Sequence, residues 1–376
     1  MPNQKQCTVR DVARAAGVNP SSVSRALRDD ASISAATKER IRAAAIRLGY
    51  RPDPMITALM ARRRAAKEHQ TSTRLAFINP FPDEAFWRSV DTYTKFYRGA
   101  CARAKRLGCE VEYFHLPALA KPNLLKTLRG RNVVGLLIGA CPAAHGRLSL
   151  PWRHFAAVAQ GYSLFSPNIS RVSNDYIDTM MLCLRQLRQC GYQRIGLAMW
   201  SAINARGNHA WISAYGGFQH YLPTRHRLPP FLPEKWTRAA FLRWFRSAKP
   251  DAIVTCQDEV ADWVQETGAR IGTDVGLAHT DLHREKSPQW AGVDQHIDQV
   301  GAGAVDLLIA LLQQNERGIP DFPRTVLTTG TWVNGSTVAV QPHPRSLLTL
   351  PKASIARNVS PARDIEAFLH RRDESR

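Results

Sequence analysis

The segment of residues 8–28, TVRDVARAAGVNPSSVSRALR, places the tightest constraint on the fold. Its apolar residues recur with the period of an α-helix, but Asn19 and Pro20 interrupt that pattern in the middle. Asn is a favoured helix N-cap, and Pro is a favoured first helical residue because its missing N–H costs nothing there. Gly17 can take the left-handed conformation that ends a helix. The segment therefore predicts two short helices joined by a tight turn.

Further signals extend this pair to a three-helix unit. Thr8 and Asp11 have capping-box spacing, which places the start of the first helix directly after Thr8. Ser34 is a favoured N-cap for a third helix that runs to Leu48, and Gly49 can end it. The apolar positions expected to share one small core are Val12, Ala13, Ala16, Val18, Val23, Ala26, Leu27, Ile41, Ala45 and Leu48.

Short polar side chains and an arginine on the second helix suit phosphates and base edges in the major groove of DNA. The alternative is an ordinary pair of surface helices. Composition favours DNA, because 51 Lys and Arg against 31 Asp and Glu give a net charge of +20, which attracts polyanions. The expected contacts are Thr8, Asn19, Pro20, Ser21, Ser22, Ser24, Arg25 and Arg28.

These residues resemble the headpiece of the lactose repressor family of bacterial transcription regulators, which reads T-x-x-D-V-A-x-x-A-G-V-S-x-x-T-V-S-R-V-L-N. Asn19 stands for the usual Ser, Ser22 for Thr and Arg28 for Asn. Pro20 fills a base-reading position that usually carries a hydrogen-bond donor, so the resemblance implies no particular operator sequence. The matching positions are Thr8, Asp11, Val12, Ala13, Ala16, Gly17, Val18, Val23, Ser24, Arg25 and Leu27.

The resemblance continues, more loosely, to about Thr337 of the 376 residues, and it implies an order of domains. Residues 1–50 are expected to form the DNA-binding headpiece, 51–73 a hinge helix and linker, and 74–340 a two-lobed core that binds an effector and dimerises. Residues 341–376 exceed what this fold needs and are rich in Pro, Ser and Arg. They are expected to be a flexible extension, with an added oligomerisation or DNA contact as the alternative.

The segment DPMITALM, residues 53–60, is apolar where a plain linker would be polar. Asp53 and Pro54 can begin a helix that is too short to be stable without a partner. The resemblance implies that this hinge helix pairs with its twin in the minor groove of DNA, where Leu59 would wedge a base step open. The alternative places Leu59 on the surface of a linker.

From Arg74 onward, short apolar strands alternate with amphipathic helices, which predicts an α/β fold with parallel sheets flanked by helices. The resemblance makes this a two-lobed, periplasmic-binding-protein-like core. It also places the crossings between the lobes near Ser170, near residues 293–296 and near Thr329. The expected strands lie in RLAFINP, CEVEYFHL, VVGLLIGA, FAAVAQG, RIGLAMW, DAIVTC and VGLAHTD.

Ligands of open α/β sheets lie beyond the carboxyl ends of the strands, and Asp258 and Asp281 each follow an expected strand. The resemblance implies that acidic residues there bond hydroxyls or amines of an effector between the lobes. Asp258 is equally suited to cap the next helix. Arg206 or His209 could replace an effector-binding arginine of many family members, because that position is Ala214 here.

Aromatic residues expected near the effector site favour a sugar as the small-molecule effector, because flat apolar rings pack against the C–H faces of sugars. Phe86, Trp87 and Trp200 are the expected ring contacts, with Trp211 near them in the chain. For each Trp the alternative is a place in the hydrophobic core.

Other functional classes have little support. Gly301-Ala302-Gly303 lies in an apolar helical pattern and follows no strand, so close helix packing is expected there and not a nucleotide loop. No P-loop, nucleophile elbow or metal motif occurs, so no catalytic residue, cofactor or metal is expected. The seven cysteines include no CxxC pair and are expected to be reduced. No apolar run approaches the roughly 20 residues of a membrane span, and MPNQKQ lacks the apolar segment of a signal peptide, so a cytoplasmic protein is expected.

The sequence thus predicts a homodimeric transcription regulator, expected to repress at a near-palindromic double-stranded operator and to respond to a sugar. An activator or dual regulator is the alternative within gene regulation. A small-molecule binding protein without a DNA role is the alternative outside it, and the headpiece argues against that alternative.

Overall fold

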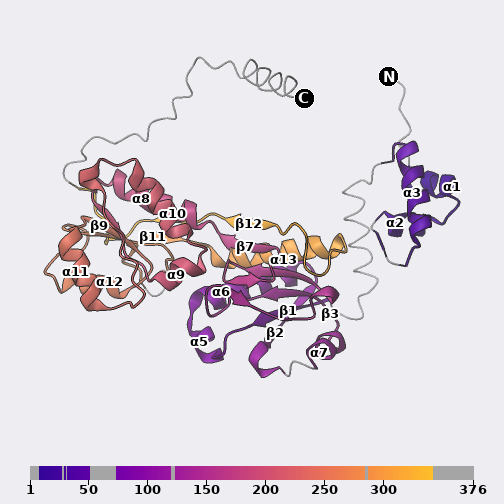
Figure 1. The fold of residues 1–376 in the computed structure, drawn as a ribbon, viewed down its shortest axis with the longest axis horizontal. Coiled ribbons are helices and arrows are strands. Elements are labelled where there is room, and N and C mark those ends of the chain that lie inside the picture. The colour runs from indigo at the N-terminus through magenta and orange to yellow at the C-terminus, as the bar shows by residue number, and fades with distance from the viewer. Residues whose placement is uncertain are drawn as a thin grey trace, which may run out of the picture. The chain divides into compact units, whose positions relative to one another are not determined.

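The computed structural model describes residues 8–27, 29–30, 32–50, 73–119, 123–283 and 287–341 (Figure 1). Arg28, Leu59, the expected hinge and nearly all of the expected C-terminal extension lie outside the described residues. The described chain contains a helical headpiece and a core of two compact units. In the core, the first unit comprises residues 73–179, 200–211 and 294–331, and the second comprises 180–199, 212–293 and 332–341. Across these residues, no helix has both the length and the apolarity needed to cross a membrane.

The headpiece contains the three helices that the sequence predicts. The capping box at the start of the first helix is present, because Oδ2 of Asp11 accepts a hydrogen bond from the Thr8 amide at 3.0 Å. Gly17 ends that helix in the left-handed conformation at φ 61°. Ser34 caps the third helix through a bond from the Thr37 amide to its Oγ. The helices are α1 (Val9–Ala16), α2 (Pro20–Ala26) and α3 (Ala35–Arg47).

Apolar residues from all three helices close one headpiece core, and Val18 and Leu27 pack against it as expected. The prediction for Leu48 is wrong, because this side chain is 39% exposed. Leu48 is the C-cap residue that follows α3, and Ala44, within the helix, faces the core in its place. The buried set is Val12, Ala13, Ala16, Val23, Ala26, Ile41, Ala44 and Ala45.

The sheet of the first unit has the strand order β12-β7-β5-β3-β1-β2, and its pairings are parallel. Adjacent residues of β1 face opposite sides, because Phe77 lies in one hydrophobic core and Ile78 in the other. The strands are β1 (Thr73–Asn79), β2 (Cys109–His115), β3 (Val133–Ile138), β5 (Ala156–Gln160), β7 (Arg171–Asn174) and β12 (Thr325–Thr328).

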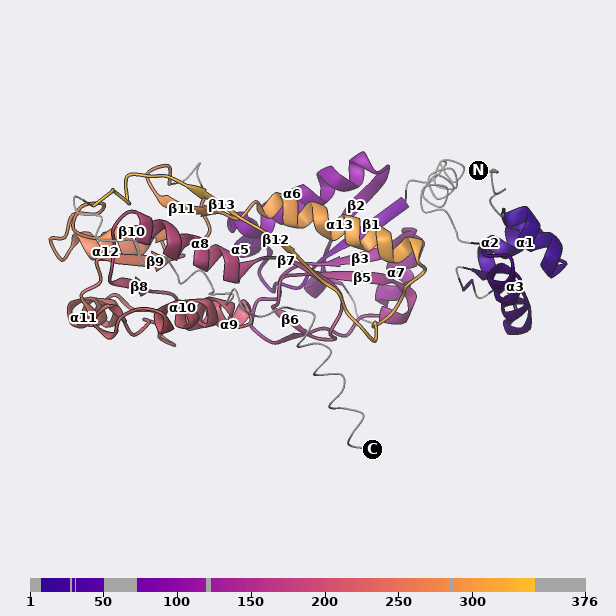
Figure 2. The same cartoon turned by 90° about the horizontal axis from the view of Figure 1, so that it is seen from above.

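Helices cover both faces of this sheet, as predicted (Figure 2). The Phe77 face is covered by α5 (Glu84–Ser89), α6 (Asp91–Arg106) and α13 (Ile297–Gln313), and the Ile78 face by α7 (Leu124–Gly130). The smaller elements of this unit are α9 (Ser201–Arg206), the parallel pair β4 (Gly146–Arg147) and β6 (Leu164–Ser166), and the 3-10 turns Leu116–Ala118 and Trp152–His154.

The sheet of the second unit has the strand order β13-β11-β10-β9-β8, and the β8–β9, β9–β10 and β10–β11 pairings are parallel. Figure 1 shows α8 and α10 on one side of this sheet and α11 and α12 on the other. Its strands are β8 (Ile195–Leu197), β9 (Ala252–Thr255), β10 (Gly276–His279), β11 (Ala291–Asp294) and β13 (Thr331–Val333). Its helices are α8 (Tyr176–Gln189), α10 (Ala210–His220), α11 (Arg238–Ala248) and α12 (Glu259–Gln265), with a 3-10 turn at Thr224–His226.

The crossings between the units agree with expectation at two places and differ at one. The chain returns to the first unit between Val293 and Asp294, and it leaves again between Thr331 and Trp332. The first crossing lies later than Ser170, because the next four residues form β7 between β5 and β12 of the first sheet. The division falls between Thr179 and Met180. The segment 200–211, which carries α9, also belongs to the first unit, and the expected crossings did not anticipate this.

The helices α6 and α13 approach so closely that their backbones touch through glycines. A Cβ atom at Gly99 would lie 2.0 Å from the carbonyl oxygen of Asp298, and one at Gly301 would lie 2.1 Å from that of Phe96. The prediction that Gly301 serves close helix packing is therefore confirmed. Any larger residue at either position would force the two helices apart.

We expect Gly301→Ala to lower the free energy of unfolding by about 1–3 kcal/mol, because the added methyl group overlaps the Phe96 carbonyl. Gly303→Ala on the same helix is the matched control, since its Cβ would lie 3.5 Å from Val172 in ordinary contact. Alanine in a helix is favoured over glycine by about 0.5–1 kcal/mol, so this control should be neutral or stabilising. Chemical denaturation followed by circular dichroism measures both. Equal stability of the two variants would contradict the close contact.

Candidate functional site

The helix α2 packs on the headpiece core through Val23 and Ala26, which are fully buried. Asn19, Pro20 and Ser21, at the start of this helix, are exposed. The Asn19 side chain makes no capping hydrogen bond, although Asn19 occupies the N-cap position. Ser22, Ser24 and Arg25 follow on α2 and are half-buried. The start of the helix therefore presents a row of small polar groups.

Arg25 and Thr8 differ in whether their side chains already form hydrogen bonds or ion pairs within the protein. Within the described chain, Arg25 forms no ion pair, so its guanidinium fork keeps its hydrogen-bond donors. Thr8 is exposed, but its hydroxyl donates to Oδ2 of Asp11 at 2.7 Å as part of the helix cap. Of the two, Arg25 is the group with donors left for another molecule.

The turn after α2 is held by an ionic contact that the sequence reasoning missed. Asp29 has the left-handed φ of 59°, and its carboxylate lies 3.1 Å from Nζ of Lys38 and 3.0 Å from Nη2 of Arg42. The hydrogen bond and charge of Lys38, with Arg42 adding to them, lower the pKa of Asp29. These contacts anchor α2 to α3. The sequence shows that Lys38 and Arg42 lie four residues apart on α3. Their pairing with Asp29 depends on the path of the turn after α2, which the sequence does not show.

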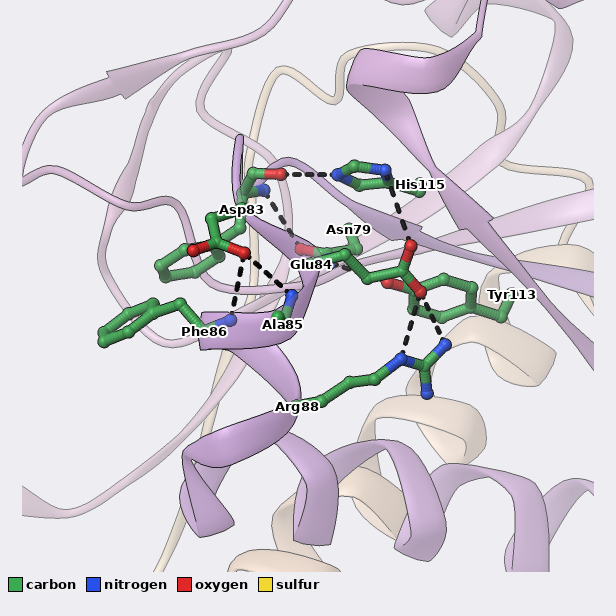
Figure 3. A network of polar contacts seen from close by, with 9 residues as sticks. Asn79, Asp83, Glu84, Ala85, Phe86, Arg88, Tyr113 and His115 are labelled. Carbon is green, nitrogen blue, oxygen red and sulfur yellow. Dashed lines mark hydrogen bonds and ion pairs between the residues drawn. The ribbon is translucent and has the colours of Figure 1, made fainter.

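In the first unit, a network of polar contacts lies at the carboxyl ends of β1 and β2 (Figure 3). Asn79, the last residue of β1, accepts from the Phe81 amide at 3.0 Å and donates to the Tyr113 hydroxyl at 2.7 Å. His115, the last residue of β2, lies with Nε2 2.8 Å from the Phe81 carbonyl oxygen. The network holds the loop that leads from β1 into α5.

The same network fixes the start of α5. Asp83 caps this helix by accepting from the Ala85 and Phe86 amides at 2.8 and 3.1 Å. Glu84 accepts from Arg88 at 2.5 and 3.1 Å, and the hydrogen bond from Arg88 lowers the pKa of Glu84. Both carboxylates are thus already engaged, and the cap sets which residues of α5 face the sheet.

The prediction that Trp87 lines an effector site is wrong. Trp87 is 1% exposed and packs in the hydrophobic core, with its ring 5.8 Å from Phe77 and 5.3 Å from Tyr113. Phe86, the preceding residue, is 51% exposed. Successive residues of a helix point about 100° apart, so the cap that turns Trp87 into the core turns Phe86 outward.

Phe86 and Arg206, both expected at the effector site, pack against one aromatic cluster of the first unit, in which the Phe81 ring is buried. The Phe86 ring is 5.9 Å from Phe81, and the guanidinium carbon of Arg206 is 5.8 Å from Phe81 and 5.7 Å from Tyr93. Arg206 also donates to the Tyr93 hydroxyl at 2.8 Å and to the Pro142 carbonyl at 2.9 Å. We call Phe81, Phe86, Tyr93 and Arg206 the Arg206 patch.

The other aromatic candidates occupy different surroundings. Trp200 is 42% exposed and occupies the N-cap position of α9. Trp211 is 4% exposed, and its ring lies 4.7 Å from that of Tyr176, so it belongs to the interior. His209 is exposed and its Nδ1 lies 3.1 Å from Nδ2 of Asn204.

In the second unit, Asp258 and Asp281 lie around one buried histidine, His279, at the carboxyl ends of β9 and β10. Oδ1 of Asp258 is 3.7 Å from Nε2 of His279, and the Asp281 amide donates to Nδ1 at 3.1 Å. Asp258 is at the N-cap of α12, but its side chain makes no capping bond and is 68% exposed. Parallel pairing of β9 with β10 brings both residues to His279, and Oδ2 of Asp281 lies 3.8 Å from Nε2 of His283.

His279 is a buried donor that the sequence reasoning missed. Burial lowers its pKa, although Asp281 and Asp258 oppose this, so the ring is neutral near pH 7. Nδ1 accepts a hydrogen bond, and the proton of the neutral ring is therefore on Nε2. Nε2 has no hydrogen-bond partner among the described residues. A ligand hydroxyl could accept from Nε2 and donate to a neighbouring carboxylate.

The six cysteines within the described chain are free thiols. Burial raises the pKa of Cys256, and the charges of Asp281 and Glu259 add to this, so the thiol stays protonated. It offers no nucleophile.

Comparison with known proteins places these features in a family context. Residues 8–53 match the family model described as "Bacterial regulatory proteins, lacI family", and residues 184–338 match "Periplasmic binding protein-like domain". The chain is similar to the HTH-type transcriptional regulator PtxS of Pseudomonas plecoglossicida, with 30% identity over 326 residues that cover 82% of this chain and 90% of the relative.

Solved structures share the fold. The lac repressor dimer bound to operator and the anti-inducer ONPF matches with a TM-score of 0.51 and 20% identity, covering 89% of this chain and 100% of that chain. The transcriptional regulator CelR–cellobiose complex matches with a TM-score of 0.51 and 17% identity, covering 88% and 100%.

We expect Trp87→Ala to lower the free energy of unfolding by about 3–5 kcal/mol, because it empties a large volume in the core of the first unit. The neighbouring Phe86→Ala is the control and should change stability by less than about 1 kcal/mol. Urea denaturation of the purified variants measures both. If Trp87→Ala unfolds with the same free energy as the parent, Trp87 is not a core residue and its role as a ligand contact is restored.

Proposed function

Because this chain belongs to the lacI family of bacterial regulatory proteins, a family of DNA-binding transcription regulators with an effector-binding domain and not of enzymes, we propose that it is a repressor switched by a sugar. The proposal includes a homodimer that binds a near-palindromic operator. It keeps the division into a headpiece of residues 1–50, a hinge and linker of 51–73, a core of 74–340 and an extension of 341–376.

The observation that carries the DNA-binding part is the polar row at the start of α2, which ends in Arg25. Small polar groups at the N-terminal end of a helix bond phosphates, while an arginine fork can bond guanine in the major groove. Arg25 has no ion pair within the described chain, so an outside acceptor costs no existing contact. The dimer and operator in the matching lac repressor structure support a two-fold arrangement here.

The sugar part rests on rings and hydroxyl-binding groups at the carboxyl ends of the strands. Phe86 exposes a ring, and Asp258, His279 and Asp281 supply two acceptors and one buried donor. Sugar hydroxyls both donate and accept, so they satisfy the Nε2 proton and a carboxylate together. The cellobiose complex among the matching structures supports this ligand class.

Switching requires that the effector bind one arrangement of the protein better than another. The proposed effector residues lie in the core and the proposed DNA contacts lie in the headpiece, so the hinge must connect the two. We keep Leu59 in the proposal as the hinge residue that wedges a base step.

For the operator, selection from random DNA should recover near-palindromic sites whose affinity falls as salt rises. Arg25→Ala should weaken binding to the selected site by about 1–3 kcal/mol and relax the base preference at one position of each half-site. The matched control is Arg14→Ala on α1, whose partner is Asp11 at 3.8 Å, and it should leave base preference unchanged. Recovery of only non-palindromic or salt-insensitive sites would refute the operator proposal.

For the effector, we expect Asp281→Ala to bind the operator like the parent but to lose its response to the sugar. A carboxylate bond to a ligand hydroxyl is worth about 1.5–3 kcal/mol, so effector affinity should fall by at least about tenfold. Asp274→Ala is the matched control, because Asp274 pairs with Arg270 on the surface of the same unit at 2.9 Å. Operator titrations with and without each member of a sugar library measure the response. A full response in Asp281→Ala would remove Asp281 from the effector site.

A further inference from the structure

Arg206 is a partly buried cation whose hydrogen bonds go only to neutral groups. Its Nη2 donates to the Tyr93 hydroxyl and its Nη1 to the Pro142 carbonyl, at 2.8 and 2.9 Å. Across the described residues, no carboxylate forms an ion pair with it. A guanidinium has five N–H donors, so three remain unused.

Other arginines of this chain are used differently. Arg194 donates through all three of its nitrogens to backbone carbonyls, and Arg171 makes three bonds to groups of neighbouring segments. Arg103, on the surface of the first unit, pairs with Asp306 at 2.7 Å. The side-chain nitrogens of Arg194 and the charge of Arg103 are thus used within the fold, whereas Arg206 uses two of its five N–H donors, and its charge meets neutral acceptors and the rings of Phe81 and Tyr93.

The two acidic residues where the loop after Phe81 enters α5 have partners of their own. Asp83 is engaged by the amides at the start of α5, and Glu84 is paired with Arg88 and lies 3.7 Å from His115. A half-buried charge favours a counter-ion more than an exposed one does, because solvent screens it less. Within the described residues, Arg206 therefore has no carboxylate as an ion-pair partner.

The location of Arg206 is that of a ligand group. Phe81 follows β1 and Pro142 follows β3, and these strands are neighbours in the parallel sheet. The patch thus lies at the carboxyl end of the sheet, where open α/β folds bind ligands. Phe86 is 51% exposed and offers apolar surface beside the guanidinium, whereas the Phe81 ring is 3% exposed and supports both groups from the core. Together they suit a molecule with C–H faces at one part and an anionic group at another.

We propose that the effector carries an anionic group, a carboxylate or a phosphate, that Arg206 binds, so that the ligand class is a sugar acid or a sugar phosphate and not a neutral sugar. This inference rests on the proposed sugar response and adds the charge of the ligand. A planar guanidinium bonds two oxygens of such a group at once. A neutral sugar would leave Arg206 without an anionic partner.

The test compares matched neutral and anionic sugars on the purified full-length protein by isothermal calorimetry. The probes are D-glucose against D-gluconate, D-glucuronate and D-glucose 6-phosphate, and D-galactose against D-galacturonate. At least one anionic probe should bind about tenfold or more tightly than its neutral counterpart. The carboxylate and phosphate probes separate the two sources of negative charge.

Variants of Arg206 connect that preference to the residue. Arg206→Gln should weaken the preferred anionic probe by at least about tenfold, and Arg206→Lys should weaken it less, because a point charge remains without the fork. Arg103→Gln removes a charge from the same unit away from the patch and should bind like the parent. The thermal midpoint of each variant without ligand checks its folding.

The outcomes separate this inference from the proposed function. If neutral probes bind as tightly as anionic ones, or if Arg206→Gln keeps full affinity, the anionic ligand is refuted while a sugar response stands. If no probe of either kind binds or changes operator affinity, both the sugar response and this inference are refuted. A tenfold preference that is lost in Arg206→Gln and kept in Arg103→Gln supports the inference.

Discussion

The backbone contact between α6 and α13 is the constraint on which the first unit depends. The chain leaves this unit after β7 and returns with α13, so the unit closes only if the returning helix packs on α6 and the sheet. Gly99 and Gly301 make that approach possible, because neither has a Cβ atom between the helices. With α13 in place, β12 adds to the sheet beside β7 and completes the edge from which the chain crosses again.

The two core units present different chemistry at the carboxyl ends of their strands. The first unit offers aromatic rings and the guanidinium of Arg206, and the second offers two carboxylates around the buried donor of His279. Each arrangement is built within one unit. The chain thus carries an apolar, cation-bearing surface in one unit and hydroxyl-binding groups in the other.

Sequence reasoning succeeded where structure follows from neighbouring residues. The capping box, Gly17 and Pro20 correctly predicted the ends of α1 and α2, because these signals act within a few residues. The alternation of apolar strands with helices located the sheets. Asp258 and Asp281 were selected because ligands of open α/β sheets bind beyond the carboxyl ends of the strands. Sequence reasoning failed at Trp87, where a rotation of one residue about a helix decides between core and surface, and at Leu48, where the helix ends one residue earlier than expected. Composition cannot resolve such a rotation.

By itself, the sequence determined the three-helix headpiece, the alternation of strands and helices, and the family to which the chain belongs. Only the tertiary structure decided that Arg206 lies against Tyr93, 113 positions away in the chain, and that Nε2 of His279 is buried with no hydrogen-bond partner among the described residues. It also placed β7 in the first sheet and so moved the first crossing beyond Ser170. The physical reason is range: capping and periodicity act along neighbouring residues, whereas charge compensation, burial and close backbone packing depend on residues that only folding brings together.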